Sequence, residues 1–285
     1  DALRAEISLD EEHYANKVME TALMFADLFE DTYATYSRDD KDIYIHLVTT
    51  NVAKRFAELC EKTKIMILMS GTLHSEDVLK NVFGIKDFAV VEAETKMPGR
   101  IYIVESGYEF DCSHENLKHK REEYLSALSS CLEKAEKPVL VPVTSFGDIP
   151  TEQEIEEHNI INITSREKLK SLQDEDKNGE IVSKFKAKLI DTLFTTKCSR
   201  GVDFPGDICN SIIFTKYPNP NVQNIFWKIL KMTHPGYFWS MYKDKAQREF
   251  LQRLYRALRS QDDHVYALSP DLRVIDALKE MQSQV

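Results

Sequence analysis

Residues 138–143, Pro-Val-Leu-Val-Pro-Val, form an apolar run of strand length that continues into Thr144-Ser145-Phe146. The run predicts a β-strand in spite of its two prolines. Similar short apolar segments recur on both sides of it and alternate with segments of helical periodicity. This alternation predicts an α/β fold in which helices flank a largely parallel sheet.

The predicted elements follow one another along the whole chain. Ile65-Met66-Ile67-Leu68-Met69 has no polar residue, so we expect a strand that is covered on both faces of its sheet. The predicted strands are 43–48, 65–69, 101–104, 138–143, 160–163, 193–196, 211–214 and 265–268. The predicted helices are 10–29, 52–62, 75–82, 115–134, 152–157, one starting at Arg166, 182–188, 222–231, 244–259 and 274–281.

Composition places the chain among ordinary globular proteins. Its 285 residues carry 37 Lys and Arg against 47 Asp and Glu, a formal net charge of −10, and 42% are hydrophobic. The length suggests about two domains, with a joint at Met97-Pro98-Gly99-Arg100. The overall acidity does not exclude nucleic-acid binding, because local charge decides it.

The distribution of apolar residues and cysteines argues against a membrane-spanning protein and against a zinc or iron–sulfur site. No apolar run approaches the about 20 residues that cross a bilayer, so no membrane partner is expected. The five cysteines are widely spaced without a C-x-x-C pair, which argues against a zinc or iron–sulfur site in this segment. An odd number of cysteines fits the reducing cytoplasm.

The most informative segment is 252–259, Gln-Arg-Leu-Tyr-Arg-Ala-Leu-Arg. On a helix, Gln252, Arg256 and Arg259 share one stripe, and Leu254 and Leu258 belong to the neighbouring apolar stripe. Such a helix packs by one side and presents two guanidinium groups that suit phosphate oxygens. Taken alone, the segment is better explained as a solvated basic face.

Two other segments carry small or hydroxyl residues next to predicted strands. In the loop 195–206, Gly201 and Gly206 permit tight turns, and Asp203 can accept from a ribose hydroxyl or hold an arginine. Ser70-Gly71-Thr72-Leu73 ends the predicted strand 65–69, at the kind of place where α/β sheets bind ligands.

In this order, the segments resemble motifs III, V and VI of superfamily-2 helicases, specifically the XPD/DinG-like group. Residues 70–73 resemble S-G/A-T-L, 199–206 resemble S-E-G-[IV]-D-F-x-G, 252–259 resemble Q-x-x-G-R-x-x-R, and 271–273 resemble the D-x-R that follows. Residues 140–146 stand where motif IV is expected. Two positions depart from the pattern: Arg200 stands where the group has Glu, and Tyr255 where it has Gly.

The resemblance implies a RecA-like fold and a division at residue 97. Residues 1–97 would be the end of the first motor domain, including the return from an arch-type insertion, and 98–285 the second motor domain. No glycine is followed by Lys-Ser or Lys-Thr, so the P-loop and any iron–sulfur domain would lie upstream. Asp10-Glu11-Glu12-His13 matches the D-E-x-H of motif II, but a capped helix start is the preferred explanation.

The family's mechanism implies roles for particular residues. ATP with Mg²⁺ would lie between two motor domains, with Arg256 and Arg259 at the β- and γ-phosphates, and Gln252 would help to orient the nucleotide or the first arginine. Gly201 and Asp203 would link the nucleotide to the DNA side, and Thr72 would couple hydrolysis to domain closure. Single-stranded DNA would contact the residues Thr144, Ser145, Ser199 and Arg200. The partners would be that DNA and the upstream P-loop domain, in a monomeric protein, and the isolated segment would not hydrolyse ATP.

Other functions remain open at this stage. The second hypothesis is a non-catalytic RecA-like module that binds nucleic acid or regulates a motor. A third is a different superfamily-2 motor, such as a nuclease-linked translocase. A metabolic α/β enzyme is least favoured, because no nucleophile–base pair stands out and the eight histidines lack metal-ligand spacing.

Overall fold

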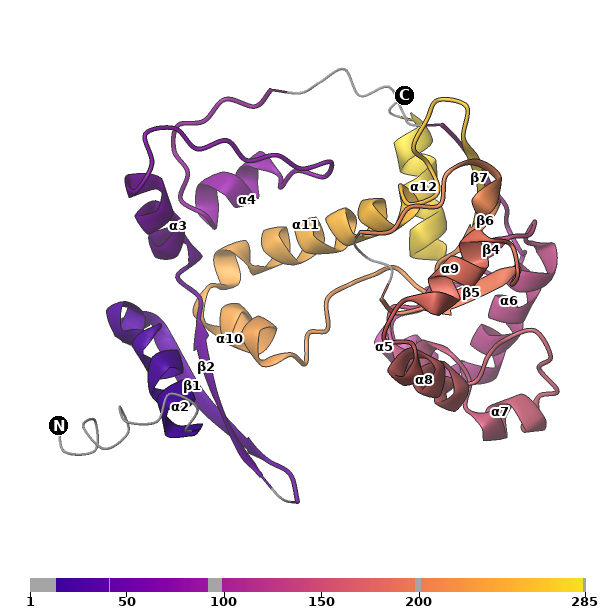
Figure 1. The fold of residues 1–285 in the computed structure, drawn as a ribbon, viewed down its shortest axis with the longest axis horizontal. Coiled ribbons are helices and arrows are strands. Elements are labelled where there is room, and N and C mark those ends of the chain that lie inside the picture. Colours follow the sequence, from indigo (N-terminus) through magenta and orange to yellow (C-terminus); the bar gives the residue numbers. More distant parts are fainter. Residues whose placement is uncertain (1–13, 41, 92–98, 198–200, 284–285) are drawn as a thin grey trace. The chain divides into compact units, whose positions relative to one another are not determined.

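The computed structural model describes residues 14–40, 42–91, 99–197 and 201–283 (Figure 1). The chain divides into two compact units, and each has its own buried apolar cluster. The first unit comprises Asp1–Ala89 and Pro220–Lys245, and the second comprises Val90–Asn219 and Ala246–Val285. Among the described residues, no helix combines the length and the hydrophobicity that a bilayer crossing requires.

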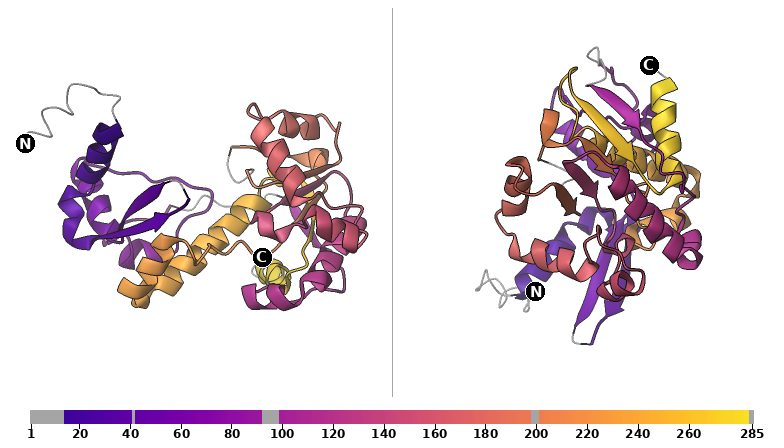
Figure 2. Two further views of the ribbon diagram at one scale, coloured as in Figure 1. Left: turned by 90° about the horizontal axis from the view of Figure 1, so that it is seen from below. Right: turned by 90° about the vertical axis from the view of Figure 1, so that its right-hand side faces the viewer.

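The second unit is built on a five-stranded parallel sheet with the order β3-β7-β6-β4-β5. Figure 2 (right) shows β3, in magenta, beside β7, in yellow. The strands are β3 (Arg100–Ile103), β4 (Val139–Pro142), β5 (Thr192–Thr195), β6 (Ser211–Ile213) and β7 (His264–Leu268). The helices are α5 (His114–His119), α6 (Arg121–Lys134), α7 (Glu152–Glu157), α8 (Arg166–Glu175), α9 (Glu180–Lys186) and α12 (Leu272–Ser283), with 3₁₀ turns η2 (Phe146–Asp148) and η3 (Gly206–Ile208). The predicted α/β fold with a parallel sheet flanked by helices is confirmed.

Strand β4 lies inside this sheet, between β6 and β5, and all four of its residues are buried. Leu140 packs into the apolar cluster on one face, which includes residues of α12, and Val139 and Val141 pack into the cluster on the other face with α6. The two helices lie on the two sides of the sheet (Figure 1). Proline has no N–H to donate to a neighbouring strand. Pro142 is the last residue of β4, so no donor is missing from the interior of the strand.

The first unit is built differently. Its one sheet among the described residues is an antiparallel pair, β1 (Thr32–Arg38) and β2 (Ile43–Thr49). Its buried cluster contains Trp227, Leu230 and Phe238. Its helices are α2 (Tyr14–Leu23), α3 (Val52–Glu61), α4 (Glu76–Asn81), α10 (Ile225–Thr233) and the first part of α11 (Pro235–Leu254), with the 3₁₀ turn η1 (Ala26–Asp31).

The predicted strand 65–69 is wrong. The segment has no regular secondary structure, and all its side chains except that of Met66 are exposed, with Ile67 at 77% and Met69 at 90%. A strand with both faces covered needs neighbouring strands to pair its N–H and C=O groups. In the described part of the first unit, the only sheet is the β1–β2 pair, and 65–69 is not part of it.

The predicted strand 160–163 is also wrong. Ile160 and Ile163 are buried in the cluster that contains α6, as a strand would require. The side-chain amide of Asn162, however, donates to the carbonyl of Ser129 at 3.0 Å, and its oxygen accepts from the Ser129 hydroxyl at 2.9 Å. Side-chain hydrogen bonds to α6 therefore hold this segment where a strand ladder was expected.

The long helix predicted over 115–134 is two helices, α5 and α6, separated at Lys120, whose φ of −124° and ψ of 42° are not helical. Arg121 starts α6 and donates to the carbonyls of Gly147 and Ile149 at 3.0 and 2.9 Å. These long-range bonds fix the start of α6 independently of α5.

Candidate functional site

The carboxyl-terminal edge of the parallel sheet is lined by polar residues. Thr144 follows β4, Thr215 follows β6 and Ser269 follows β7. The N–H of Thr144 donates to the Thr215 hydroxyl at 3.3 Å, and the Ser269 hydroxyl donates to the Phe214 carbonyl at 2.8 Å. Because the strands are parallel, their loops meet at this edge, where open α/β sheets bind ligands.

Asp203 brings together two arginines from the segment 252–259. One oxygen of its carboxylate accepts from Arg256 Nη1 at 2.9 Å and also from Arg259 Nη2. Arg256 additionally donates to the Val202 carbonyl at 3.1 Å. Partial burial opposes the ionisation of Asp203, but the hydrogen bonds from Arg259 and Arg256 outweigh it and lower its pKa.

The two guanidinium groups differ in exposure. The Arg256 side chain is 11% exposed and the Arg259 side chain 45%. Arg256 is therefore part of the packed structure, whereas Arg259 reaches solvent while it is paired. A ligand with phosphate oxygens can replace the Asp203 carboxylate at the exposed guanidinium first.

The helix predicted over 244–259 ends earlier, at Leu254, and also starts earlier, at Pro235. α11 ends at Leu254, so Arg256 and Arg259 lie in the turn that follows it and do not share a helical stripe with Gln252, which is in the last turn of α11. The Arg256 carbonyl accepts from the Phe204 N–H at 2.8 Å. This bond to the loop 201–206 draws the chain out of helical geometry, and it places both arginines over Asp203.

Thr144 and Ser145, predicted to contact DNA, lie at the edge as expected from their place after β4. The Thr144 hydroxyl accepts from Arg253 Nη1 at 2.9 Å, and Arg253 pairs with Glu249 at 3.1 Å. Ser145 is exposed, and its hydroxyl accepts from the Gly147 N–H at 3.2 Å at the start of η2. The edge therefore presents a serine hydroxyl to solvent beside a fixed threonine.

Arg253 was not predicted as a site residue. It is buried, with 9% of its surface exposed, and it links α11 to the loop after β4. The signal in the sequence is the spacing of four residues from Glu249, which favours an ion pair along a helix. Its bond to Thr144 is a tertiary contact that the spacing does not indicate.

Asp148 joins the loop after β4 to the loop after β6. Its buried carboxylate accepts from the Ser145 N–H at 2.8 Å, from the Thr215 hydroxyl at 3.1 Å and from Lys216 Nζ at 2.5 Å. A buried carboxylate with three donors is well satisfied, and removal of any one partner is costly. The position of Ser145 is therefore rigid.

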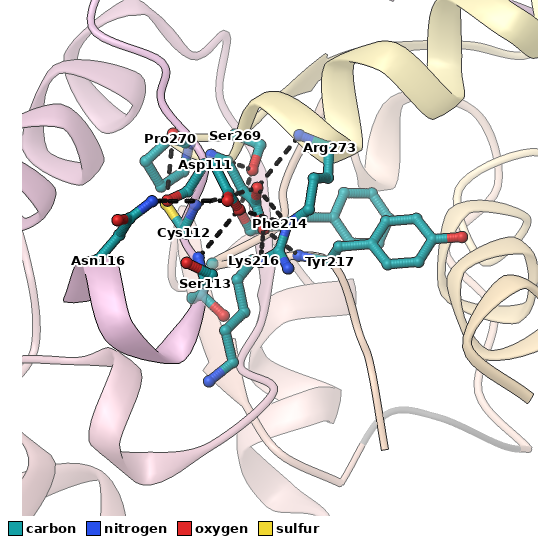
Figure 3. A network of polar contacts seen from close by, with 12 residues as sticks. Asp111, Cys112, Ser113, Asn116, Phe214, Lys216, Tyr217, Ser269, Pro270 and Arg273 are labelled. Atoms are coloured by element: carbon teal, nitrogen blue, oxygen red, sulfur yellow. Dashed lines mark hydrogen bonds and ion pairs between the residues drawn. The ribbon is translucent and has the colours of Figure 1, made fainter. Parts of the chain in front are cut away.

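Asp271 and Arg273, the predicted D-x-R, form the network in Figure 3. The fully buried Asp271 accepts from the Tyr217 N–H at 2.8 Å and from Arg273 Nη2 at 2.8 Å. Arg273 Nε also pairs with Asp111 at 3.2 Å. Partial burial opposes the charge on Arg273, but Asp271 outweighs it and raises its pKa. The network ties together the segments before α5, after β6 and before α12.

The remaining predicted residues are spread over the chain. Gly201 has a φ of 77°, so its backbone uses the left-handed region that favours glycine. Thr72 belongs to the first unit, where it is 8% exposed and its N–H donates to the Ser70 hydroxyl at 3.1 Å. Ser199, Arg200 and the segment 10–13 lie outside the described residues.

Comparison with known protein families identifies a region that contains most of the second unit. Residues 128–284 match the family model described as helicase C-terminal domain, and the match includes Thr144, Asp203 and both arginines. A comparison with curated proteins gives no match. Since the family model covers more than half of the chain and includes strands β4, β5, β6 and β7 of the parallel sheet, the chain belongs to the helicase C-terminal domain family.

Proposed function

We propose that this chain is the C-terminal motor portion of an ATP-dependent DNA helicase or translocase of the XPD/DinG type. Membership of the helicase C-terminal domain family points to a helicase-type ATPase in general. The finer assignment is supported by one observation: Asp203 and the two arginines, about 50 residues apart in the sequence, share hydrogen bonds. In this proposal, residues 1–97 complete the first RecA-like motor domain and residues 98–285 form the second.

The nucleotide would be ATP with Mg²⁺, held mainly by an upstream P-loop domain. The cluster fits a phosphate group, because two guanidinium groups already share one anionic oxygen at Asp203. Bound ATP would supply the phosphoryl group that is transferred to water. Arg259, the more exposed guanidinium, would stabilise the charge on that group, with Arg256 beside it, and Gln252 would help to orient the nucleotide or Arg256. Gly201 would allow the loop to approach closely.

Single-stranded DNA would cross the carboxyl-terminal edge of the sheet. Ser145 and Thr144 would donate to its phosphates, together with Ser199 and Arg200, without reading its sequence. The exposure of Ser145 supports this part of the proposal. Thr72, in the first unit, would couple hydrolysis to domain closure. We further propose that the protein is a cytoplasmic monomer.

Arg259→Ala in the complete protein tests the role of the arginines. The rate of ATP hydrolysis is expected to fall by about 10³-fold or more, because the phosphoryl charge loses its partner, while single-strand affinity stays within about twofold. Arg100→Ala, which removes an exposed arginine from β3, is the matched control and should keep full activity. Equal loss of hydrolysis and DNA binding in a folded Arg259→Ala protein would contradict this role.

Arg200→Glu tests the DNA path. The substitution introduces the residue that the XPD/DinG-like group has at this position. It is expected to change the DNA affinity and its dependence on salt concentration, and to change the nucleotide affinity less. The measurement is the DNA dissociation constant over a range of salt concentrations. An unchanged slope would remove Arg200 from the DNA path.

A second candidate is a non-catalytic RecA-like module that binds nucleic acid or regulates a motor. Tyr255, which replaces the glycine of motif VI, favours it, because its ring is partly buried against the main apolar cluster. The intact mass and N-terminal sequence of the native protein separate the two candidates. A native chain with a P-loop supports the motor, and one without it supports the binding module.

A further inference from the structure

The turn after α11 carries Arg256 and Arg259. Asp263 lies between this turn and β7, and its buried carboxylate accepts hydrogen bonds from three backbone N–H groups. One oxygen accepts from the N–H of Arg259 at 2.6 Å and from that of Ser260 at 2.7 Å. The other oxygen accepts from the N–H of Gly206 at 3.0 Å. No feature of the sequence singled out this residue.

The three N–H groups belong to the two segments that carry the candidate site. Gly206 ends the loop that contains Asp203, and Arg259 is one of the two arginines. Gly206 has a φ of 60°, a left-handed turn that aims its N–H at the carboxylate. One carboxylate therefore sets the separation between the Asp203 loop and the backbone of Arg259.

The only other backbone bond between these segments in the described structure is that from Phe204 to Arg256, at 2.8 Å. It holds the Arg256 side of the turn, three residues before Arg259. Without Asp263, the only remaining polar contact between Arg259 and the loop in the described structure would be that of its own long side chain with Asp203. The position of that guanidinium would then vary with its rotamers.

The backbone of Asp263 extends the connection to the start of β3. Its carbonyl accepts from the Arg100 N–H at 2.8 Å. A Cβ on Gly99 would overlap the same carbonyl, so this close approach requires glycine. Arg100, the last residue of the predicted domain joint, is thus bonded to the same residue that bonds the backbone of Arg259.

The charge of Asp263 is stabilised where it lies. Burial opposes its ionisation, but the N–H groups of Arg259, Ser260 and Gly206 outweigh it and lower its pKa. The carboxylate is therefore ionised at neutral pH, and each of its bonds is charge-assisted. An amide in its place has only one oxygen and cannot accept from both segments equally well.

We propose that Asp263 is the positioning residue of the Asp203–Arg256–Arg259 cluster, holding it in register with the start of β3. Its effect on catalysis rests on the proposed ATPase function, whereas its effect on the cluster's geometry does not. Asp263 touches no reacting group in this proposal. It acts by limiting the positions that Arg259 can take, and displacement of such a group by about 1 Å can cost up to about 100-fold in rate.

The first test is amide hydrogen exchange in this chain, comparing wild type with Asp263→Asn. Exchange at Gly206, Arg259 and Ser260 is expected to be at least about tenfold faster in the variant, while amides of β4 stay unchanged. Asp262→Asn, which makes the same charge change at the exposed neighbour, is the matched control and should match wild type. Unchanged exchange at the three amides would overturn the proposal.

The second test is ATP hydrolysis by the complete protein. Asp263→Asn is expected to lower kcat by about 10- to 100-fold and to leave the KM for ATP and the affinity for single-stranded DNA within about twofold. If Asp263 acts through Arg259, the losses in Asp263→Asn and Arg259→Lys will not add in the double variant. Additive losses, or an unchanged kcat with faster exchange, would overturn the catalytic part.

The two tests separate the two proposals. If the wild-type protein does not hydrolyse ATP and Asp263→Asn still releases the three amides, the ATPase function fails while the positioning role stands. If Asp263→Asn does not fold, Asp263→Glu replaces it, because it keeps the charge but displaces the carboxylate by one methylene. Wild-type exchange and kcat in Asp263→Glu would then overturn the proposal.

Discussion

Leu140 and Leu68 lie in similar apolar runs, but Leu140 is buried and Leu68 is exposed. Leu140, in the second unit, is 1% exposed in the interior strand β4, whereas Leu68, in the first unit, is 57% exposed and lies outside any strand. An apolar run therefore indicates that a segment tends to be buried. Whether the segment is buried depends on the neighbouring strands and helices.

The physical reason is that a strand needs partners in two directions. Its N–H and C=O groups must pair with adjacent strands, and its side chains must be covered on each face. β4 has both, since β6 and β5 flank it and apolar clusters cover its two faces. In the described part of the first unit, the segment 65–69 has neither.

The largest expected effect comes from the same substitution in the two runs. Leu140→Ala is expected to lower the free energy of unfolding by about 3 kcal/mol, because it leaves a cavity in the core. Leu68→Ala is expected to change it by less than about 0.5 kcal/mol. Urea denaturation followed by circular dichroism measures both. Similar losses would show that Leu68 is buried in solution, and the comparison would fail.

A second prediction asks whether the polar edge of the second unit is as critical as its core. Asp271→Asn is expected to cost about 2 kcal/mol, because the buried partner of Arg273 loses its charge and one acceptor oxygen. Asp276→Asn, at an exposed position of α12, is the control and should be near neutral. If both variants unfold at the same urea concentration as wild type, the network in Figure 3 does not stabilise the unit.

A third prediction uses pH to follow the second unit. Arg121 donates to both oxygens of Glu154, at 2.8 and 3.1 Å, and with Thr151 it lowers the pKa of Glu154 from 4.5 to about 2. The resulting stability is present above pH 4.5 and is lost as the pH falls through this window to about 2. Glu154→Gln is expected to cost about 1–2 kcal/mol at pH 7.

The measurement is urea denaturation of wild type and Glu154→Gln at several pH values. The difference in free energy should shrink steadily as the pH falls from 4.5 to about 2. Glu152→Gln, exposed in the same helix, should show no such trend. A difference that is independent of pH would contradict the ion pair with Arg121.

The smallest expected effect compares helix caps in the two units. Asn51 accepts from the Lys54 N–H at 3.0 Å at the start of α3, and Ser165 accepts from the Lys168 N–H at 3.1 Å at the start of α8. Because capping is local, Asn51→Ala and Ser165→Ala are each expected to cost about 1 kcal/mol. Loss only in Ser165→Ala would show that the first unit does not unfold cooperatively, which sharpens the contrast between the units.

Local elements were predictable where a few neighbouring residues control them. Helices α4 and α8 start where the sequence predicted, because the side-chain oxygens of Ser75 and Ser165 each reach an N–H three residues later. The strands around 139–142 and 211–213 were predicted from short apolar runs. The end of α11 was not, because the bond from Phe204 to the Arg256 carbonyl comes from a distant segment.

The sequence by itself determined the order of the five sheet strands in the second unit, the glycine at the left-handed position 201, and which residue types could meet a phosphate. Only the tertiary structure decided that Arg256 and Arg259 converge on Asp203, that Arg253 holds Thr144, and that Asp263 joins the two segments. The physical reason is range: periodicity and capping act over a few residues, whereas these bonds join residues 53 to 109 positions apart.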